Sequence, residues 1–111
     1  MTTSIRRWVE TDTGHRVPNH KSMCRNLHGH RYRWEAEFEG DVVTKEGVSE
    51  EGMLIDFGDI AKILEEHNHD VVDHAFIVYE GDNEALEALS SMEDGHRTLV
   101  VPFIPTAENL A

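Results

Sequence analysis

The chain has 111 residues, of which 39% are hydrophobic and 29% charged, and its formal net charge is −12. This length suits one domain, and the composition is that of a folded protein rather than a disordered one. The acidic balance argues against nucleic acid and anionic membrane surfaces as partners, because their phosphates would be repelled.

Cysteine usage and the N-terminal sequence indicate a cytoplasmic location. Cys24 is the only cysteine, so an internal disulfide is excluded. Residues 1–10 contain no apolar run typical of a signal peptide, and no stretch approaches the roughly 18 apolar residues of a membrane span. An anionic substrate would need a local basic patch, which the first third of the chain could supply from Arg6, Arg7, Lys21, Arg25, Arg31 and Arg33.

The predicted elements begin with a strand over residues 4–11 and a polar loop over residues 13–26. The clearest strand covers residues 28–39, where His28, His30, Tyr32, Trp34, Ala36 and Phe38 alternate with glycine and charged residues. Residues 40–52 form a polar connection. A helix is predicted over residues 56–67, with Asp56 or Asp59 as its N-terminal cap.

The second half of the chain continues the alternation. Residues 74–79 are predicted to form a strand, residues 84–92 a helix, and residues 99–104 a strand interrupted by Pro102. Pro105-Thr106-Ala107-Glu108 is a typical helix start with Thr106 as the cap. This order of elements predicts a single α+β domain over residues 1–111.

The histidines suggest a metal site. His28 and His30 are two residues apart on a strand, so their side chains project from the same face and can reach one ion. His67 and His69 have the same spacing but end a predicted helix, where residues i and i+2 lie roughly 200° apart. Geometry therefore favours the first pair, although H-x-H is a short pattern that also occurs without a metal.

A catalytic zinc ion usually has three protein ligands and one open position. His15 is the natural third ligand, because it follows the first strand, which can pair with the second. His20 competes for this role but lies deep in the polar loop. Three imidazoles and an open position favour zinc without excluding other metals that bind imidazole.

Two further motifs could carry proton chemistry. Cys24, four residues before His28, could be a fourth ligand that closes a structural site. It could instead be a free thiol near the metal, activated by Arg25 and the ion as a proton acceptor. In Asp73-His74, a carboxylate could fix the imidazole tautomer. Adjacent residues on a strand point in opposite directions, so this pair would need a loop geometry.

Together these motifs resemble the 6-pyruvoyl-tetrahydropterin synthase family along essentially the whole chain. In order, they are His15, Cys24-x-x-x-His28-Gly29-His30, Gly52-x-Leu54-x-Asp56-Phe57, Asp73-His74 and Pro105-Thr106-Ala107-Glu108-Asn109. The three residues between Cys24 and His28 resemble the bacterial queuosine-pathway branch, the 6-carboxy-5,6,7,8-tetrahydropterin synthases. The resemblance implies the T-fold, or tunnelling fold: an antiparallel sheet with two helices on one face, assembled into an oligomeric barrel that is usually a hexamer.

The resemblance also implies an activity. It is the zinc-dependent conversion of 7,8-dihydroneopterin triphosphate to 6-carboxy-5,6,7,8-tetrahydropterin, with release of acetaldehyde and triphosphate. His15, His28 and His30 would bind Zn²⁺, which would make the substrate hydroxyls more acidic. Cys24 would be the general base, and Asp73 with His74 would form the other proton-transfer unit in a site between subunits. Thr106 and Glu108 would lie near the pterin.

Family members usually continue through a long third helix into a final strand that carries a pterin-binding glutamate. This chain stops at Ala111, one turn into the helix, which predicts a truncated domain. Two alternatives to the predicted activity remain. One is a 6-pyruvoyl-tetrahydropterin synthase or another pterin lyase on the same fold, and the other is an inactive, zinc-stabilised oligomeric binding protein.

Overall fold

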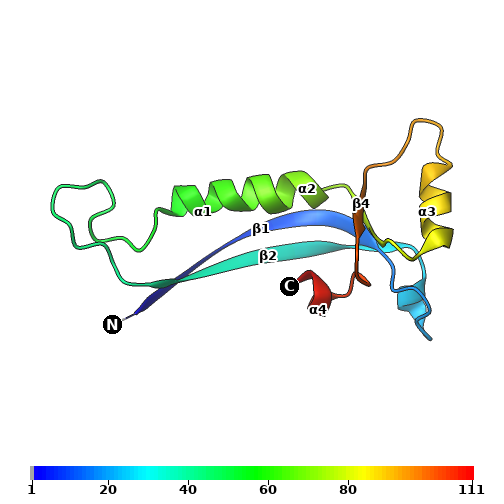
Figure 1. Cartoon of the computed structure of the whole chain (residues 1–111), viewed down its shortest axis with the longest axis horizontal. Coiled ribbons are helices and arrows are strands. Elements are labelled where there is room, and N and C mark those ends of the chain that lie inside the picture. The colour runs from blue at the N-terminus through cyan, green and yellow to red at the C-terminus, as the bar shows by residue number, and fades with distance from the viewer. Residues whose placement is uncertain (1) are drawn as a thin grey trace. The chain divides into compact units, whose positions relative to one another are not determined.

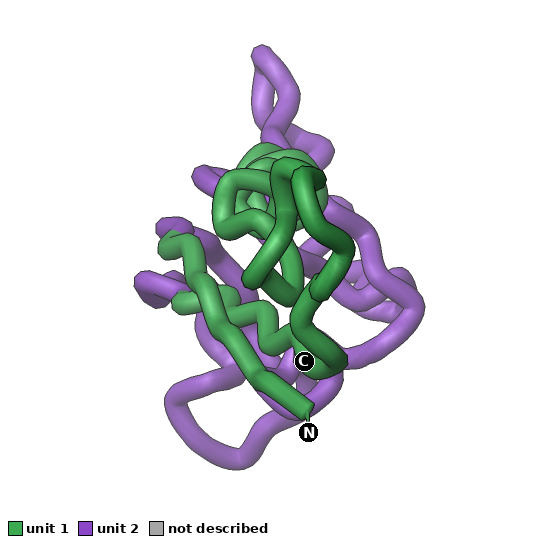
Figure 2. The backbone as a smooth tube through the Cα atoms, turned by 90° about the vertical axis from the view of Figure 1, so that its left-hand side faces the viewer, with its two compact units in different colours: residues 1–10, 33–70 green, residues 11–32, 71–111 purple. Residues whose placement is uncertain are grey.

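The computed structural model describes residues 2–111, which form two compact units (Figure 2). Of the described residues, unit 1 comprises 2–10 and 33–70, and unit 2 comprises 11–32 and 71–111. Every site residue predicted from the sequence falls in unit 2. Within the described part of the chain, no helix is both long and apolar enough to cross a membrane.

Four strands form one mixed sheet in the order β2-β1-β3-β4. They are β1 (Thr3–His15), β2 (His28–Gly40), β3 (Phe76–Tyr79) and β4 (Thr98–Val101). β2 runs back beside β1 (Figure 1), whereas β3 pairs in parallel with both β1 and β4. The predicted antiparallel sheet is therefore wrong. The connection from β3 to β4 carries a helix, and such a crossover returns the chain in the same direction.

β1 extends further than the sequence predicted, because it continues through Gly14 and His15, which pair with Phe76 and Ile77 of β3. A Cβ atom on Gly14 would lie only 2.6 Å from Cδ2 of Phe76, so glycine is needed for this close approach. β4 is shorter than predicted and ends at Val101, since Pro102 has no N–H to donate to the sheet. The α+β class is confirmed.

The first helical segment is α1 (Phe57–Leu64), which continues through a π-helical turn (Glu65–His69) into α2 (Asp70–Val72). The predicted cap is confirmed, because the Asp56 carboxylate accepts a hydrogen bond from the backbone N–H of Gly58 at 2.6 Å. In unit 1, Ile60 and Leu64 are buried on one side of α1. This segment is longer than the predicted helix, since the wider turn carries the chain beyond His67.

The core of unit 2 forms between β3 and α3 (Asn83–Ser90), where Phe76, Val78, Ala85 and Leu89 are buried together. A short 3₁₀ turn (Met23–Arg25) interrupts the loop after β1, and α4 (Ala107–Leu110) ends the chain. Because α1 and α3 belong to different units, the expected placement of two helices on one face stays a prediction.

An ion pair fixes the start of α3 to the end of β1. Asp82 is 6% exposed, and its carboxylate accepts a hydrogen bond from the backbone N–H of Ala85. The same carboxylate accepts two hydrogen bonds from the Arg16 guanidinium. Arg16 is the main reason that the pKa of Asp82 lies below its usual value of 3.8. Asp82 thus serves both as a helix cap and as an anchor for the residue that follows His15.

We expect Asp82→Asn to lower the free energy of unfolding by about 2–3 kcal/mol at pH 7, because asparagine keeps the cap but loses the ion pair. A carboxylate with a lowered pKa stabilises the fold above its unfolded pKa of about 3.8, and this contribution is lost as the pH falls through the folded value. Urea unfolding from pH 7 downward should show the difference between the two proteins shrinking. Asp56→Asn, at a cap without such an ion pair, is the matched control. A difference independent of pH would contradict this account.

Candidate functional site

Three histidines meet where β1 ends and β2 begins. The ligand nitrogens of His15, His28 and His30 all lie within 4.8 Å of one another. Nε2 of His30 lies 3.1 Å from Nε2 of His15. Two nitrogens bound tetrahedrally to one zinc ion at 2.0–2.1 Å would be about 3.3 Å apart, so the observed spacing fits a shared ion.

Hydrogen bonds to backbone carbonyls fix the tautomers of two of these rings. Nδ1 of His15 donates to the carbonyl of Pro105 at 2.7 Å, and Nδ1 of His28 donates to that of Asn26 at 2.7 Å. Because a carbonyl oxygen can only accept, each Nδ1 carries the proton and each Nε2 keeps its lone pair. Metal-binding histidines typically donate the other ring N–H to a backbone carbonyl or a carboxylate in this way.

Burial also favours the ligand form of His15, which is 7% exposed. Burial, followed by the neighbouring imidazoles of His28 and His30, lowers the pKa of His15 below its usual value. A neutral imidazole is the form that binds a metal. The residues present therefore fit a zinc ion.

Tyr32 was not among the predicted site residues, although it continues the alternation of His28 and His30 along β2. Its ring makes edge contacts with His15 at 5.8 Å and His30 at 5.7 Å between centroids. Burial raises the pKa of Tyr32. The strand periodicity could have identified this aromatic wall beside the histidines, since Tyr32 shares their face.

Cys24 is exposed in the 3₁₀ turn and is not part of the histidine cluster. Its carbonyl accepts from the N–H of Val17 at 2.8 Å, which closes the loop that carries it. The Arg25 guanidinium points back to the carbonyls of Lys21 and Ser22, at 3.5 and 3.4 Å. Among the described residues, the cluster thus consists of three imidazoles without a thiol.

The Asp73-His74 pair has the loop geometry that the sequence argument required. His74 has a φ of +58°, a left-handed conformation that is costly for a residue with a Cβ. As a result, the Asp73 carboxylate accepts from Nδ1 of His74 at 2.9 Å. Its other oxygen accepts from the backbone N–H of Asp12 at 3.0 Å. The carboxylate fixes the tautomer, which leaves the lone pair of the ring on Nε2 of His74.

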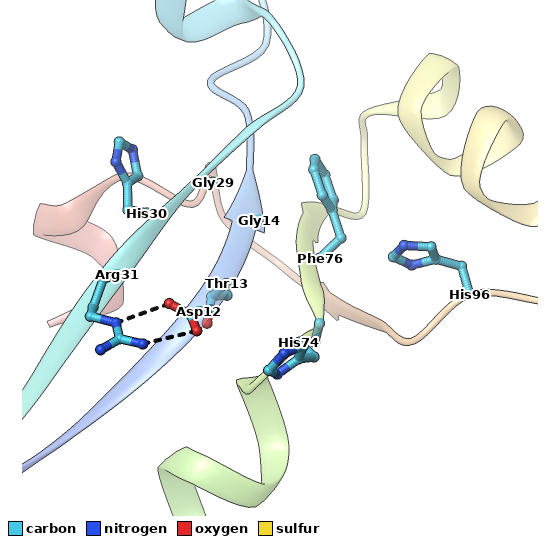
Figure 3. Close-up of a pocket in the computed structure, with 10 residues that line it drawn as sticks. Asp12, Thr13, Gly14, Gly29, His30, Arg31, His74, Phe76 and His96 are labelled. Atoms are coloured by element: carbon cyan, nitrogen blue, oxygen red, sulfur yellow. Dashed lines mark hydrogen bonds and ion pairs between the residues drawn. The ribbon is translucent and has the colours of Figure 1, made fainter.

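His74 lines a shallow, open pocket of about 540 Å³ (Figure 3). The other lining residues are Asp12, Thr13, Gly14, Gly29, His30, Arg31, Ala75, Phe76 and His96. The Arg31 guanidinium makes two hydrogen bonds to the Asp12 carboxylate, at 3.0 and 3.2 Å, and is the first cause of a lowered pKa of Asp12. Sequence reasoning missed Asp12 and His96, which lie outside any short motif.

Several of the basic side chains that could supply a patch have partners of their own. Three of the guanidinium groups lie beside carboxylates: Arg6 with Glu37, Arg31 with Asp12, and Arg33 with Glu35. Arg7 donates to the carbonyl of Phe57 at 2.8 Å. The pairs of Arg6 with Glu37 and of Arg31 with Asp12 join β1 to β2, whereas Arg33 and Glu35 lie two residues apart on β2.

The Pro105–Glu108 segment is tied to the histidine cluster by the hydrogen bond from His15 to the Pro105 carbonyl. Thr106 is the cap of α4, as predicted, and its hydroxyl accepts from the N–H of Asn109 at 3.2 Å. Glu108 is exposed in the first turn of α4. The structure thus places Pro105, at the start of the segment predicted to lie near the pterin, in contact with the histidine cluster.

Comparison with known proteins agrees with this picture. Residues 4–111 match the family model for 6-pyruvoyl tetrahydropterin synthase. The chain belongs to this family. It is 34% identical over 105 residues to a 6-carboxy-5,6,7,8-tetrahydropterin synthase from Rickettsia bellii, which covers 95% of this chain and 72% of the relative. It is 37% identical over 102 residues to the Haemophilus influenzae protein of the same name, covering 90% of this chain and 70% of the relative.

A solved structure supports the fold of this family member. An uncharacterized protein from Wolinella succinogenes matches with a TM-score of 0.71 and 23% identity, covering all of this chain and 79% of that chain. The predicted membership in the 6-pyruvoyl-tetrahydropterin synthase family is confirmed, together with the similarity to its 6-carboxytetrahydropterin branch.

Proposed function

We propose that this protein is a zinc-dependent lyase that converts 7,8-dihydroneopterin triphosphate and water to 6-carboxy-5,6,7,8-tetrahydropterin, acetaldehyde and triphosphate, as a step of queuosine biosynthesis. The observation that carries the proposal is the three-imidazole cluster in a member of this family. The names of the two bacterial relatives support the choice of product. The proposal includes a cytoplasmic homo-oligomer, with a hexamer as the expected form.

His15, His28 and His30 would hold the zinc ion, and Tyr32 would limit access of water from one side. When bound, zinc would act as a Lewis acid that makes the side-chain hydroxyls of the substrate more acidic. Cys24 would accept a proton from the substrate, and Nε2 of His74 would exchange a second one while Asp73 holds the ring. Thr106 and Glu108 would position the pterin.

The alternation of the strands supports a site shared between subunits. His30 and Arg31 are consecutive on β2, so their side chains leave the strand on opposite sides, as Figure 3 shows. The Asp73-His74 pair bonds to the backbone of Asp12, whose carboxylate pairs with Arg31. We therefore propose that Asp73 and His74 of one subunit complete the metal site of a neighbour.

The direct test is incubation of the zinc-loaded protein with 7,8-dihydroneopterin triphosphate, followed by product identification by mass spectrometry. We expect 6-carboxytetrahydropterin and acetaldehyde. A 6-pyruvoyl product would favour the other lyase activity, and bound zinc without turnover would favour the binding protein.

We expect Cys24→Ala to abolish most turnover, by roughly 100-fold or more, while one zinc ion per chain remains bound, since a proton acceptor is lost and the ligands stay. Turnover and zinc content are measured on the same preparation. Ser22→Ala, in the same exposed loop, is the matched control. Loss of zinc from Cys24→Ala would identify the thiol as a ligand instead.

A further inference from the structure

The peptide unit between Asp73 and His74 is held at both of its polar ends. Its N–H, which belongs to His74, donates to the carbonyl of Asp12 at 2.8 Å. Its carbonyl, which belongs to Asp73, accepts from Nε of Arg97 at 3.0 Å. A peptide unit is planar, so two bonds on its opposite ends fix the orientation of the whole plane.

This orientation matters because the plane sets the φ angle of His74. At +58°, that angle is sterically unfavourable for a residue with a side chain, and it persists only where surrounding contacts hold it. The same angle turns the imidazole back toward the Asp73 carboxylate, to give the 2.9 Å hydrogen bond. Losing either of the two hydrogen bonds to this peptide unit would allow the turn to relax.

Arg97 is itself well placed to hold this carbonyl. Its own carbonyl accepts from the N–H of Phe76 at 3.0 Å, just before β3 and β4 pair from Phe76 and Thr98 onward. The backbone of Arg97 is thus hydrogen-bonded to Phe76, which follows the Asp73-His74 pair in the chain. Its side chain reaches back to the peptide unit between Asp73 and His74. A guanidinium donates in a fixed planar direction, which suits this orienting contact.

We propose that Arg97 is a positioning residue: it holds the Asp73–His74 peptide in the conformation that makes the two side chains a hydrogen-bonded pair. The inference rests on the proposed function in so far as the pair transfers protons. Arg97 does not touch the reacting atoms in this account. It acts only through the conformation of His74.

The test uses the zinc-loaded protein and its variants Arg97→Ala and Arg97→Lys. In wild type, the ¹⁵N chemical shifts of the imidazole should report a His74 ring that carries its proton on Nδ1, a signal assigned by its absence in His74→Ala; nitrogen shifts are used because the ring is 75% exposed and its proton exchanges with water. We expect Arg97→Ala to lose this signal and to lower kcat roughly 10–100-fold, with KM and zinc content unchanged. Arg97→Lys, which keeps a flexible donor, should recover part of both. Lys62→Ala removes an exposed cation from α1 in unit 1 and should change neither.

The NMR measurement needs no turnover, so it decides the inference even if the proposed reaction is wrong. A retained signal of the Nδ1-protonated ring in Arg97→Ala would overturn the inference, whatever happens to kcat. Loss of zinc or of cooperative unfolding in both variants would also overturn it, because Arg97 would then support the fold in general rather than this turn.

Discussion

Replacing His30 by alanine should remove the bound zinc and lower turnover by roughly 1,000-fold or more. Mutating a residue that hydrogen-bonds to a metal ligand typically lowers metal affinity or activity by roughly 10–100-fold, so loss of a ligand itself should lower them more. His30 is also the ring whose Nε2 lies 3.1 Å from that of His15, so its removal leaves two ligands and a widened gap. Zinc per chain by atomic emission and turnover of 7,8-dihydroneopterin triphosphate measure the two effects.

A matched control comes from His67 and His69, which are two residues apart in the sequence, as His28 and His30 are. His69 lies in the π-helical turn, where it pairs with Asp70 at 3.2 Å. His69→Ala should keep both zinc and turnover. Full zinc content in His30→Ala, or its loss in His69→Ala, would show that the metal site has been assigned to the wrong histidines.

Mixing two inactive variants should restore activity. Cys24→Ala removes the proposed proton acceptor beside the metal ligands, and His74→Ala removes the imidazole of the Asp73-His74 pair. If each site combines residues of two subunits, unfolding and reassembling the variants together in equal amounts should leave about a quarter of the sites with both wild-type residues. Each variant reassembled alone should stay inactive. The readout is turnover of the mixture against each parent, with oligomer size measured by light scattering.

The outcome depends on where His74 acts. If His74 served the metal site of its own chain, every mixed site would lack one of the two residues and no activity would return. An active monomer would contradict the proposal directly. Co-unfolding of Cys24→Ala with the double variant Cys24→Ala/His74→Ala is the control, because no subunit then supplies the thiol.

Local pattern predicted much of the fold. The strict alternation over residues 28–39 identified β2 and placed His28 and His30 on one face, since side-chain direction on a strand follows directly from residue spacing. Asp56 and Thr106 were recognised as caps, because capping depends on a residue and the next few backbone N–H groups. The order of the motifs also identified the family, which the comparison confirms.

Contacts between distant segments could not be predicted in this way. Three features join residues that are far apart in the sequence. They are the parallel pairing of β3 with β1, the extension of β1 to His15 and the ion pair of Arg31 with Asp12. No local periodicity encodes such register, which is set by the packing of the whole chain. The same holds for the left-handed turn at His74, where the cost of the conformation is offset by bonds to Asp12 and Arg97. The sequence alone thus determined which residue types could bind a metal and transfer protons. Tertiary structure decided which of them meet, because long-range hydrogen bonds and burial set their orientation.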